Sequence, residues 1–455
     1  MITRETIQKF DRPGPRYTSY PTAPVWDASV DSSVYIEKLK IFGRSGKTLS
    51  LYIHIPFCES LCRFCACHVL IHRQDEKYGD EYLRHLFAEI DLACRHIGRK
   101  VTVRQLHWGG GTPTFLSQGQ IERLYGKLKD NFDIRPEGEI AIEIDPRTID
   151  LPKLQLLRKL GFNRLSMGVQ DFDPLVQQAV NRIQPFEQVR QFTGWARDLG
   201  FASINFDLIY GLPKQTRGSF DETMKKVLEL RPERVALYSF AYLPWLKKHQ
   251  LNFSQADLPA PDEKLDIFLS ARGQFLEAGY NAIAMDHFAL AGDELSRAYV
   301  NNRLYRNFMG YTVKPADEFI GLGLTSIGFL ENTFFQNAKI LKDYYSALDA
   351  GRLPVERGKD LSADDIIRQY VITQLMCHFN VDKEAFAAKF ATAFDDYFSA
   401  EAEHIRYCEA EGLVYNTPGR IEVTDFGRVF VRNICMGFDF YLRQKEAVQR
   451  FSQTI

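Results

Sequence analysis

The chain has 455 residues, of which 45% are hydrophobic and 25% are charged, and its formal net charge is -1. This length exceeds that of one ordinary domain, so we expect a large domain with at least one appendage. The balanced charge excludes a global field that favours nucleic acid or an anionic membrane, so any attraction for an anionic ligand must be local.

The N-terminal segment does not have the pattern of a secretory signal. Its sequence, MITRETIQKFDRPGPRYTSYPTA, has no apolar h-region. Nowhere does the chain approach the roughly 18 consecutive apolar residues that indicate a spanning helix. We therefore expect a soluble, cytoplasmic protein in which residues 1–42 form an arm over the functional site.

Residues 43–280 alternate short β-branched runs with longer helical patterns, which is typical of βα units in a parallel sheet. Between the runs, segments such as 82–94 and 121–128 have apolar residues at helical spacing. The sequence predicts an α/β fold with a partial (β/α)6 barrel of the TIM type, whose sites form at the carboxyl ends of the strands. The six predicted strands end at Ile55, Trp108, Ile144, Val169, Tyr210 and Phe240.

The strongest motif follows the first predicted strand, where four of the eight cysteines fall within ten residues: Cys58, Cys62, Cys65 and Cys67. Cysteines this sparse overall do not build a disulfide scaffold, and thiolates this dense favour a soft metal. One interpretation is a structural zinc ion with His68 or His72 as fourth ligand. The other is an iron-sulfur cluster on the first three thiols, because Cys67 is too close to Cys65 for both to reach separate corners of a cube. Such a cluster leaves one iron open.

Further unusual residues follow the later strands. The glycine run 109–111 lets the backbone approach a ligand with its N–H groups exposed, although such a run is also found in plain turns. Glu143 is a costly charge to bury without a partner. Gln170, Arg182 and Asp207 would each be ordinary surface residues alone. Their shared position at strand ends favours a ligand site.

From about residue 362 the pattern changes to helices. Within this region LVYNTPGRIEVT, at 413–424, gives two short alternating runs before a helix capped by Thr424 or Asp425. We expect a C-terminal, mainly helical, winged-helix-like domain over 362–455, after a barrel extension and connector over 281–361. Because the charge is neutral, packing or a lid role is favoured over DNA binding.

The C-x3-C-x2-C spacing, with Phe64 before the third cysteine, is the signature of the radical S-adenosylmethionine superfamily. Within that superfamily the chain closely resembles the oxygen-independent coproporphyrinogen III oxidases, and Cys67 completes their C-x3-C-x2-C-x-C form. The segments that carry the resemblance are GPRYTSYPTA at 14–23, LYIHIPFC at 51–58, QLHWGGGTPT at 105–114, IEIDPR at 142–147, FNRLSMGVQDF at 162–172, DLIYGLPKQT at 207–216, MDHFA at 285–289 and RNICMGFD at 432–439.

The resemblance implies one 4Fe-4S cluster and two S-adenosylmethionine molecules. The cluster ligands match Cys58, Cys62 and Cys65, while Cys67 matches a family cysteine that is not a ligand. Positions that contact the cluster-bound S-adenosylmethionine match Tyr52, Gly110, Glu143 and Ile327. Positions around the second molecule match Phe64, Gly111, Thr112, Gln170, Arg182, Asp207 and Ala241.

The implied reaction is the oxygen-independent decarboxylation of two propionates of coproporphyrinogen III, which gives protoporphyrinogen IX on the way to haem. It needs an electron donor, such as a flavodoxin or a ferredoxin-like protein, and an electron acceptor, and the resemblance implies a monomer. The substrate carries four carboxylates, so fixed cations should line its pocket. Arg16, in the arm, is the candidate, and with Cys67 it completes the expected catalytic residues.

Three positions depart from the family pattern. Ala66 and His68 flank Cys67 where glycine and asparagine are usual, and Met309 replaces a common glutamine. A thioether cannot make the hydrogen bonds of an amide. An alternative is therefore a paralogue that handles haem, as a chaperone or a haem-degrading methyltransferase, although such relatives generally lack the fourth cysteine and the arm. A zinc-stabilised binding protein would leave the glycine run unexplained.

Overall fold

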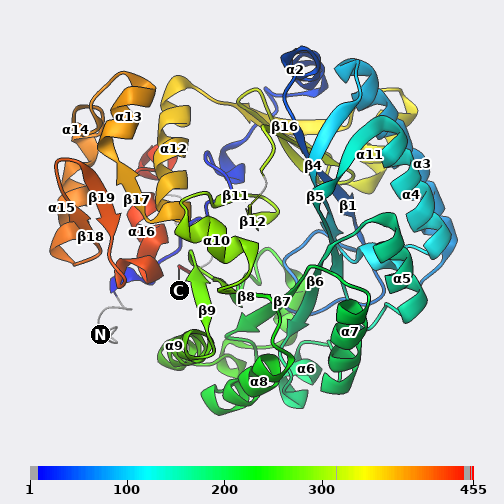
Figure 1. The fold of residues 1–455 in the computed structure, drawn as a ribbon, viewed down its shortest axis with the longest axis horizontal. Helices are drawn as coiled ribbons and strands as arrows, with labels where there is room; N and C mark the ends of the chain where they lie inside the picture. Colours follow the sequence, from blue (N-terminus) through cyan, green and yellow to red (C-terminus); the bar gives the residue numbers. More distant parts are fainter. Residues whose placement is uncertain (1–8, 314, 445–450, 452, 455) are drawn as a thin grey trace.

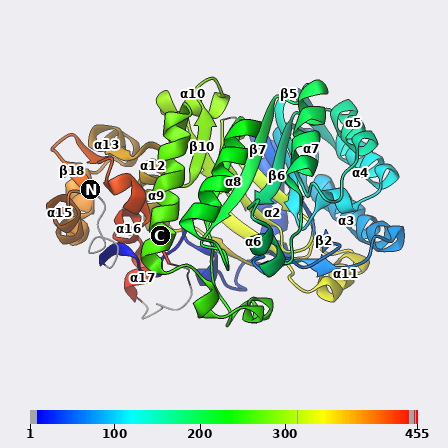
Figure 2. The same ribbon diagram turned by 90° about the horizontal axis from the view of Figure 1, so that it is seen from below.

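The computed structural model of the protein describes residues 9–313, 315–444, 451, 453 and 454. Figure 1 shows a strongly curved sheet with helices on its outer face, beside a smaller and mainly helical unit. In the view from below, α6 and α11 lie on the side of the molecule opposite α10 (Figure 2). Among the described residues, no helix has the length and apolar character needed to cross a bilayer.

The curved sheet has twelve strands in the order β16-β15-β14-β13-β1-β4-β5-β6-β7-β8-β10-β9. Neighbours from β13 to β8 are parallel, and the remaining pairs at both edges are antiparallel. The strands are β1 (Leu49–Ile55), β4 (Val101–Gly110), β5 (Phe132–Ile144), β6 (Arg164–Gln170), β7 (Ser203–Tyr210), β8 (Arg234–Ser239), β9 (Tyr280–Ile283), β10 (His287–Leu290), β13 (Glu318–Leu322), β14 (Ile327–Leu330), β15 (Thr333–Asn337) and β16 (Val355–Asp360).

Helices cover the outer face of the sheet and connect its parallel strands, as parallel strands require when both of their faces are buried. The outer helices are α2 (Ser32–Ser45), α3 (Glu76–Ile97), α4 (Gln118–Asn131), α5 (Leu151–Leu160), α6 (Pro174–Ala179), α7 (Phe186–Asp198), α8 (Arg217–Leu230) and α9 (Pro261–Glu277), with α10 (Glu294–Val300) and α11 (Leu341–Asp349) further along the chain. Two short pairs complete this part: β2 (Phe57–Cys58) with β3 (Leu70–Ile71), and β11 (Tyr305–Asn307) with β12 (Gly310–Thr312).

The six strands predicted from the sequence are confirmed as β1, β4, β5, β6, β7 and β8, and each ends within two residues of its expected end. The two predicted helices are also present, but longer. α3 extends the expected segment 82–94 at both ends because Asp75 caps its first turn and Gly98 ends it in the left-handed conformation. The sheet continues beyond the six predicted strands into residues 280–360, where the sequence predicted a barrel extension but no individual strands.

The C-terminal unit contains α12 (Ala363–His378), α13 (Lys383–Phe390), α14 (Phe394–Tyr397), α15 (Ala402–Ala410), α16 (Val431–Met436) and α17 (Phe440–Gln444). A small sheet joins β17 (Asn380–Asp382), β19 (Arg420–Val423) and β18 (Val414–Asn416). Of the two expected caps, Thr424 is the one that acts: its Oγ1 accepts a bond from Gly427 N at 2.9 Å. The strand β17 was not expected.

The N-terminal arm lies between the curved sheet and the C-terminal unit. Arg432 Nε donates to the Pro15 carbonyl at 2.9 Å, and Tyr17 OH donates to Asp439 at 3.1 Å. On the other side, Arg16 Nη2 donates to the Ser239 carbonyl at the end of β8 at 3.0 Å. The arm therefore joins the two parts of the protein.

The expected domain boundaries at 42/43, 280/281 and 361/362 stay a prediction. Residues 1–8 of the expected arm, and residues 445–450, 452 and 455 of the expected C-terminal domain, lie outside the described residues.

Candidate functional site

A cavity of about 520 Å³ opens where β1, β4, β5, β6 and β7 end. This is the edge of a parallel barrel at which the loops build sites. Most of the residues singled out from the sequence line it together: Cys58, Cys62, Phe64, Cys65, Cys67, Gly110, Gly111, Thr112, Glu143, Gln170, Arg182 and Asp207. These strand ends therefore border one cavity.

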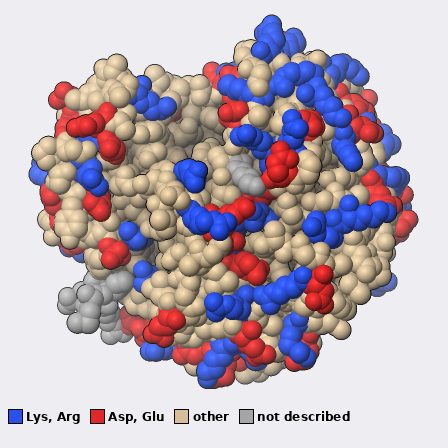
Figure 3. Space-filling model, in the orientation of Figure 1, with Lys and Arg blue, Asp and Glu red and all other residues tan. Residues whose placement is uncertain are grey.

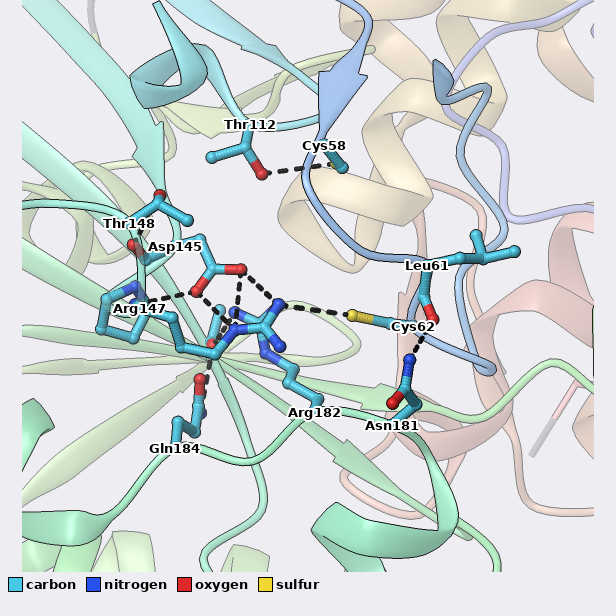
Figure 4. Close-up of polar contacts among 12 residues, drawn as sticks. Cys58, Leu61, Cys62, Thr112, Asp145, Arg147, Thr148, Asn181, Arg182 and Gln184 are labelled. Atoms are coloured by element: carbon cyan, nitrogen blue, oxygen red, sulfur yellow. Dashed lines mark hydrogen bonds and ion pairs between the residues drawn. The ribbon is translucent and has the colours of Figure 1, made fainter. Parts of the chain in front are cut away.

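Two of the thiols have defined polar neighbours (Figure 4). Cys58 Sγ shares a hydrogen bond with Thr112 Oγ1 at 3.4 Å, and burial raises the pKa of Cys58 to about 11. Cys62 Sγ lies 3.6 Å from Arg182 Nη1 and 3.8 Å from Arg147 Nη2. A thiolate at Cys62 would thus face two guanidinium groups, and a metal at Cys58 would offset the cost of its charge.

The other two thiols of the motif are coupled to each other. A hydrogen bond from Cys67 lowers the pKa of Cys65 to about 7. The same bond raises the pKa of Cys67. Of the two thiols, Cys65 is therefore the easier to ionise.

An ion-pair network stands on the wall beside Cys62. Asp145 Oδ2 accepts from Arg147 Nη2 at 2.6 Å and from Arg182 Nη1 at 2.9 Å. Burial alone would raise the pKa of Asp145, but the two arginines hold it below its ordinary value. Arg182 Nη2 also donates to the Gly168 carbonyl at 2.6 Å, so this side chain is fixed in place.

Gln170 has the features of a ligand-binding residue. Its φ of 66° is in the left-handed region, which is unfavourable for a residue with a side chain and is often seen at functional sites. Its Oε1 is buried on the cavity wall and has no hydrogen-bond partner among the described residues. An unpaired buried acceptor is costly, so a donor from a bound molecule would stabilise this arrangement.

Glu143 is held at the end of β5 by two donors. Its carboxylate accepts from His107 Nε2 at 3.1 Å and from Gly110 N at 3.1 Å. Burial would raise the pKa of Glu143, but the hydrogen bond from His107 contributes most to keeping it below its ordinary value. A Cβ at Gly109 would lie 2.6 Å from this carboxylate, so the glycine run is needed for the close approach.

Asp207 is the second carboxylate of the cavity. It accepts from Ser166 Oγ at 3.1 Å and from Asn205 Nδ2 at 2.9 Å. Burial first, and then the charge of Glu143, raise the pKa of Asp207 to about 6. Two acceptors therefore face the same space from β5 and β7.

Four expected site residues do not line this cavity in the described part of the chain: Arg16, Tyr52, Ala241 and Ile327. Tyr52 lies one layer deeper, where its OH shares a hydrogen bond with His54 Nδ1 at 3.1 Å. Arg16 lies over the ring of Tyr238, which does line the cavity, at 5.7 Å from the ring centre. Ile327 packs instead against a cluster that contains Trp26.

The positions that depart from the family pattern also have defined places. Ala66 and His68 are exposed beside Cys67. Met309 occupies the turn between β11 and β12, where its N donates to Asn307 Oδ1 at 2.9 Å. A separate cavity of about 410 Å³ lies near this hairpin, between the arm and α12, and none of the expected site residues lines it.

The donor set fits an iron-sulfur cluster better than a single ion. Among the described residues, no three histidine, cysteine, aspartate or glutamate side chains converge as ligands of one metal ion. The three thiols instead line one cavity together with Gln170, whose Oε1 is unpaired. A cluster puts each thiolate on a separate iron, so its three ligands need not converge on one point.

Sequence reasoning assigned no role to three residues that shape the site: His107, Asp145 and Arg147. Asp145 and Arg147 follow β5 directly, in the segment IEIDPR, and that position was their signal. His107 carried no signal, because its importance depends on the register of β4 with β5.

Comparisons with known proteins agree with this geometry. Residues 52–227 match the Radical SAM superfamily, and residues 361–430 match the HemN C-terminal domain. An oxygen-independent coproporphyrinogen III oxidase from Synechocystis is 42% identical over 100% of this chain and 98% of its own length. One from Escherichia coli is 44% identical over 99% and 97%. The solved structure of Escherichia coli coproporphyrinogen III oxidase (HemN), described as a radical SAM enzyme, superposes with a TM-score of 0.90 at 42% identity, covering 94% of this chain and 97% of that one.

Proposed function

The chain belongs to the oxygen-independent coproporphyrinogen III oxidases of the radical SAM superfamily, and we propose that its cavity converts coproporphyrinogen III to protoporphyrinogen IX. The observation that carries this proposal is the shared cavity, which brings the three motif thiols together with the glycine run, Glu143, Gln170 and Asp207. The protein is thus an oxidoreductase of porphyrin and haem biosynthesis.

The family implies a 4Fe-4S cluster and S-adenosylmethionine. When bound, the cluster supplies the electron for reductive cleavage of S-adenosylmethionine to methionine and a 5'-deoxyadenosyl radical. Cys58, Cys62 and Cys65 would hold the cluster. In this proposal Cys67 stays off the metal and keeps its thiol proton, which it donates toward the Cys65 sulfur.

We assign the first S-adenosylmethionine to the side of the cavity near Glu143. The carboxylate, held by His107 and Gly110 N, is suited to accept hydrogen bonds from a cationic amino group. Tyr52 lies behind it, and Ile327 completes the proposed set. Since Ile327 does not line the cavity, β14 would have to lie closer to the cavity for Ile327 to contact the bound molecule.

We assign a second S-adenosylmethionine to the remaining wall. Its proposed contacts are Phe64, Gly111, Thr112, Gln170, Arg182, Asp207 and Ala241. The unpaired Oε1 of Gln170 and the raised pKa of Asp207 support this assignment, because a hydroxyl or amino donor would satisfy both groups. Arg182 already donates to Asp145, so its role would be to hold the wall beside Cys62.

Arg16 is the proposed anchor for a propionate of the substrate. Its side chain is 29% exposed and lies 3.9 Å from Asp286, so it keeps donors for a further carboxylate. With S-adenosylmethionine bound, the chemistry it supplies would remove a hydrogen atom from the β-carbon of a propionate. Loss of carbon dioxide, and of one electron to the electron acceptor that the reaction requires, would then leave a vinyl group.

We also infer a cytoplasmic monomer with a flavodoxin or a ferredoxin-like electron donor. All eight cysteines are free, which is typical of proteins from reducing compartments. A second candidate, a paralogue that handles haem, rests on Met309, because the amide expected there is replaced by a thioether.

The test is an anaerobic assay of the iron-reconstituted protein with S-adenosylmethionine, dithionite and coproporphyrinogen III, in which 5'-deoxyadenosine and porphyrin products are followed together. Formation of protoporphyrinogen IX is the expected result. Deoxyadenosine without loss of carbon dioxide would reject this substrate and favour the paralogue.

A further inference from the structure

Large apolar side chains are exposed on the segment that follows β8. Trp245, Leu246 and Leu251 are each 65% exposed. Three basic residues stand among them: Lys247, Lys248 and His249. Exposed apolar side chains that gather in one short segment, with charges of one sign around them, are typical of surfaces that bind another protein.

This segment is bonded to the loop that carries the cysteines. His249 Nε2 donates to the Cys65 carbonyl at 2.8 Å, and Lys247 Nζ donates to the Cys67 carbonyl at 3.0 Å. Gln250 Nε2 donates to the Phe64 carbonyl at 3.3 Å. The exposed apolar residues therefore stand directly outside the backbone that holds the third metal-binding thiol.

A second group lies against the same loop from the start of α11. Ile340 is 63% exposed, and Lys339 precedes it. Partial burial, and then the positive charges of Lys247 and Lys339, lower the pKa of His68, so both lysines lie near this residue of the cysteine loop. We name the combined surface the loop patch and define it by Trp245, Leu246, Lys247, Lys248, Leu251, His68, Lys339 and Ile340.

The loop patch has a net positive charge, although the chain as a whole is almost neutral. The acidic residue bonded to it is Glu356, whose carboxylate accepts from Lys339 N at 3.0 Å. The patch itself contains three lysines, Lys247, Lys248 and Lys339, which outweigh this negative charge. A positive rim around apolar side chains favours an acidic protein and speeds its encounter at low ionic strength.

We propose that the loop patch is the docking surface for a small, acidic protein that carries one electron. This inference rests on the proposed function, because each cleavage of S-adenosylmethionine uses one electron delivered to the cluster. In that step the reduced carrier loses one electron and the cluster gains it. Complexes between redox partners are small and transient, burying less than about 1,200 Å² in total, so their docking surfaces need only a few apolar side chains with a charged rim.

The experiment measures binding and electron delivery separately. Binding of an acidic flavodoxin to the cluster-loaded protein is followed by calorimetric titration, at low and at high salt. S-adenosylmethionine cleavage is then measured twice, once with reduced flavodoxin and once with dithionite, which needs no docking surface. The variants are Trp245→Ser and Lys248→Glu, both at exposed positions where the fold is not at stake. Lys129→Glu, on the exposed side of α4, is the matched control.

We expect each patch variant to weaken flavodoxin binding by about tenfold and to slow flavodoxin-driven cleavage, with dithionite-driven cleavage unchanged. The control should match the wild type in every measurement, and salt should weaken wild-type binding. Unchanged flavodoxin binding in both patch variants would overturn the proposal. A raised KM for coproporphyrinogen III with dithionite would also overturn it, by showing that the patch serves the tetrapyrrole.

Failure of the proposed function gives a different result. In that case the wild type forms no protoporphyrinogen IX with dithionite, while flavodoxin binding can still be compared among the variants. The two inferences are thus tested by independent readouts.

Discussion

At the scale of single residues, the site depends on charges that neighbouring strand ends bring within bonding distance. Asp145 holds Arg147 and Arg182 so that both guanidinium groups face the Cys62 sulfur. Each of these groups would be costly to bury alone, and together they satisfy one another. The wall beside Cys62 is therefore prepared for a thiolate before any metal binds.

Cys62→Ala should abolish both the bound cluster and the activity, because it removes one of three iron ligands and leaves the two arginines without the sulfur. Iron content and visible absorbance after reconstitution measure this directly. Cys94→Ala, on α3 away from the cavity, is the matched control and should keep its cluster. Full turnover by the Cys62 variant would refute the ligand assignment.

Met309→Gln should fold normally and raise the affinity for S-adenosylmethionine by a few fold, since an amide at this turn can donate and accept hydrogen bonds. Equilibrium binding of S-adenosylmethionine checks this. Met309→Leu keeps the size and apolar character of the side chain and should leave binding unchanged. Equal affinities in all three proteins would show that methionine in place of glutamine at this position does not weaken the binding of S-adenosylmethionine.

The sequence predicts site residues well where one residue carries its own signal. The cysteines, the glycine run and Glu143 stand at strand ends and were found for that reason. His107 was not found, because its partner Glu143 is 36 residues away and the contact depends on the pairing of β4 with β5. Arg16 and Ile327 were expected from the resemblance, and the structure places both outside the cavity wall.

At the scale of elements, a buried carboxylate fixes α3 to the far half of the sheet. Glu89 accepts from Gly323 N at 2.8 Å, from Asn337 Nδ2 at 2.6 Å and from Tyr344 OH at 2.6 Å. These partners lie after β13, on β15 and on α11. One side chain thus joins four elements.

The contribution of Glu89 to the free energy of unfolding of the protein should fall as the pH rises from about 4.5 to 7. Burial raises the pKa of Glu89 to about 7 in the folded protein, although its three hydrogen bonds oppose the shift. In this window the folded state keeps a proton that the unfolded state has lost, so ionisation costs up to about 3 kcal/mol. The difference in Tm between wild type and Glu89→Gln should shrink or reverse across this window, because glutamine does not titrate. If the Tm values of the two proteins changed with pH in parallel, the raised pKa of Glu89 would be contradicted.

Most of the strands that the sequence did not predict are short. The strands β13 to β16 are four to six residues long, and three of them contain a glycine, such as Gly321, where a Cβ would lie 2.1 Å from the Ile327 carbonyl. Short strands with glycine show little β-propensity, and their pairing partner β1 lies far away in the chain. Long parallel strands with β-branched runs, by contrast, were all found.

At the scale of the whole molecule, the arm joins the curved sheet to the C-terminal unit. Arg432 is buried and donates to the carbonyls of Gly14, Pro15 and Gln453. Both 14–23 and 432–439 were recognised as family segments, but nothing in the sequence indicated that they touch. Elsewhere, acidic and basic side chains are interspersed over the face shown in Figure 3, as the near-zero net charge predicts.

Arg432→Met should destabilise the protein by about 3 kcal/mol, because three buried carbonyls lose their donor. It should also raise the KM for coproporphyrinogen III more than it lowers kcat, since the arm carries Arg16. Calorimetry and steady-state kinetics measure the two effects. Arg420→Met, at an exposed position on β19, is the control and should change neither. An unchanged KM would show that the arm does not contribute to substrate binding.

The clamp on the arm also has a consequence for the order in which the protein is completed on the ribosome. Pro15 is synthesised 417 residues before the arginine that holds it. The barrel and its cysteine loop have therefore left the ribosome well before the arm can dock. The contacts between the arm and the C-terminal unit are thus among the last to form, after all the strands that carry the site have been synthesised.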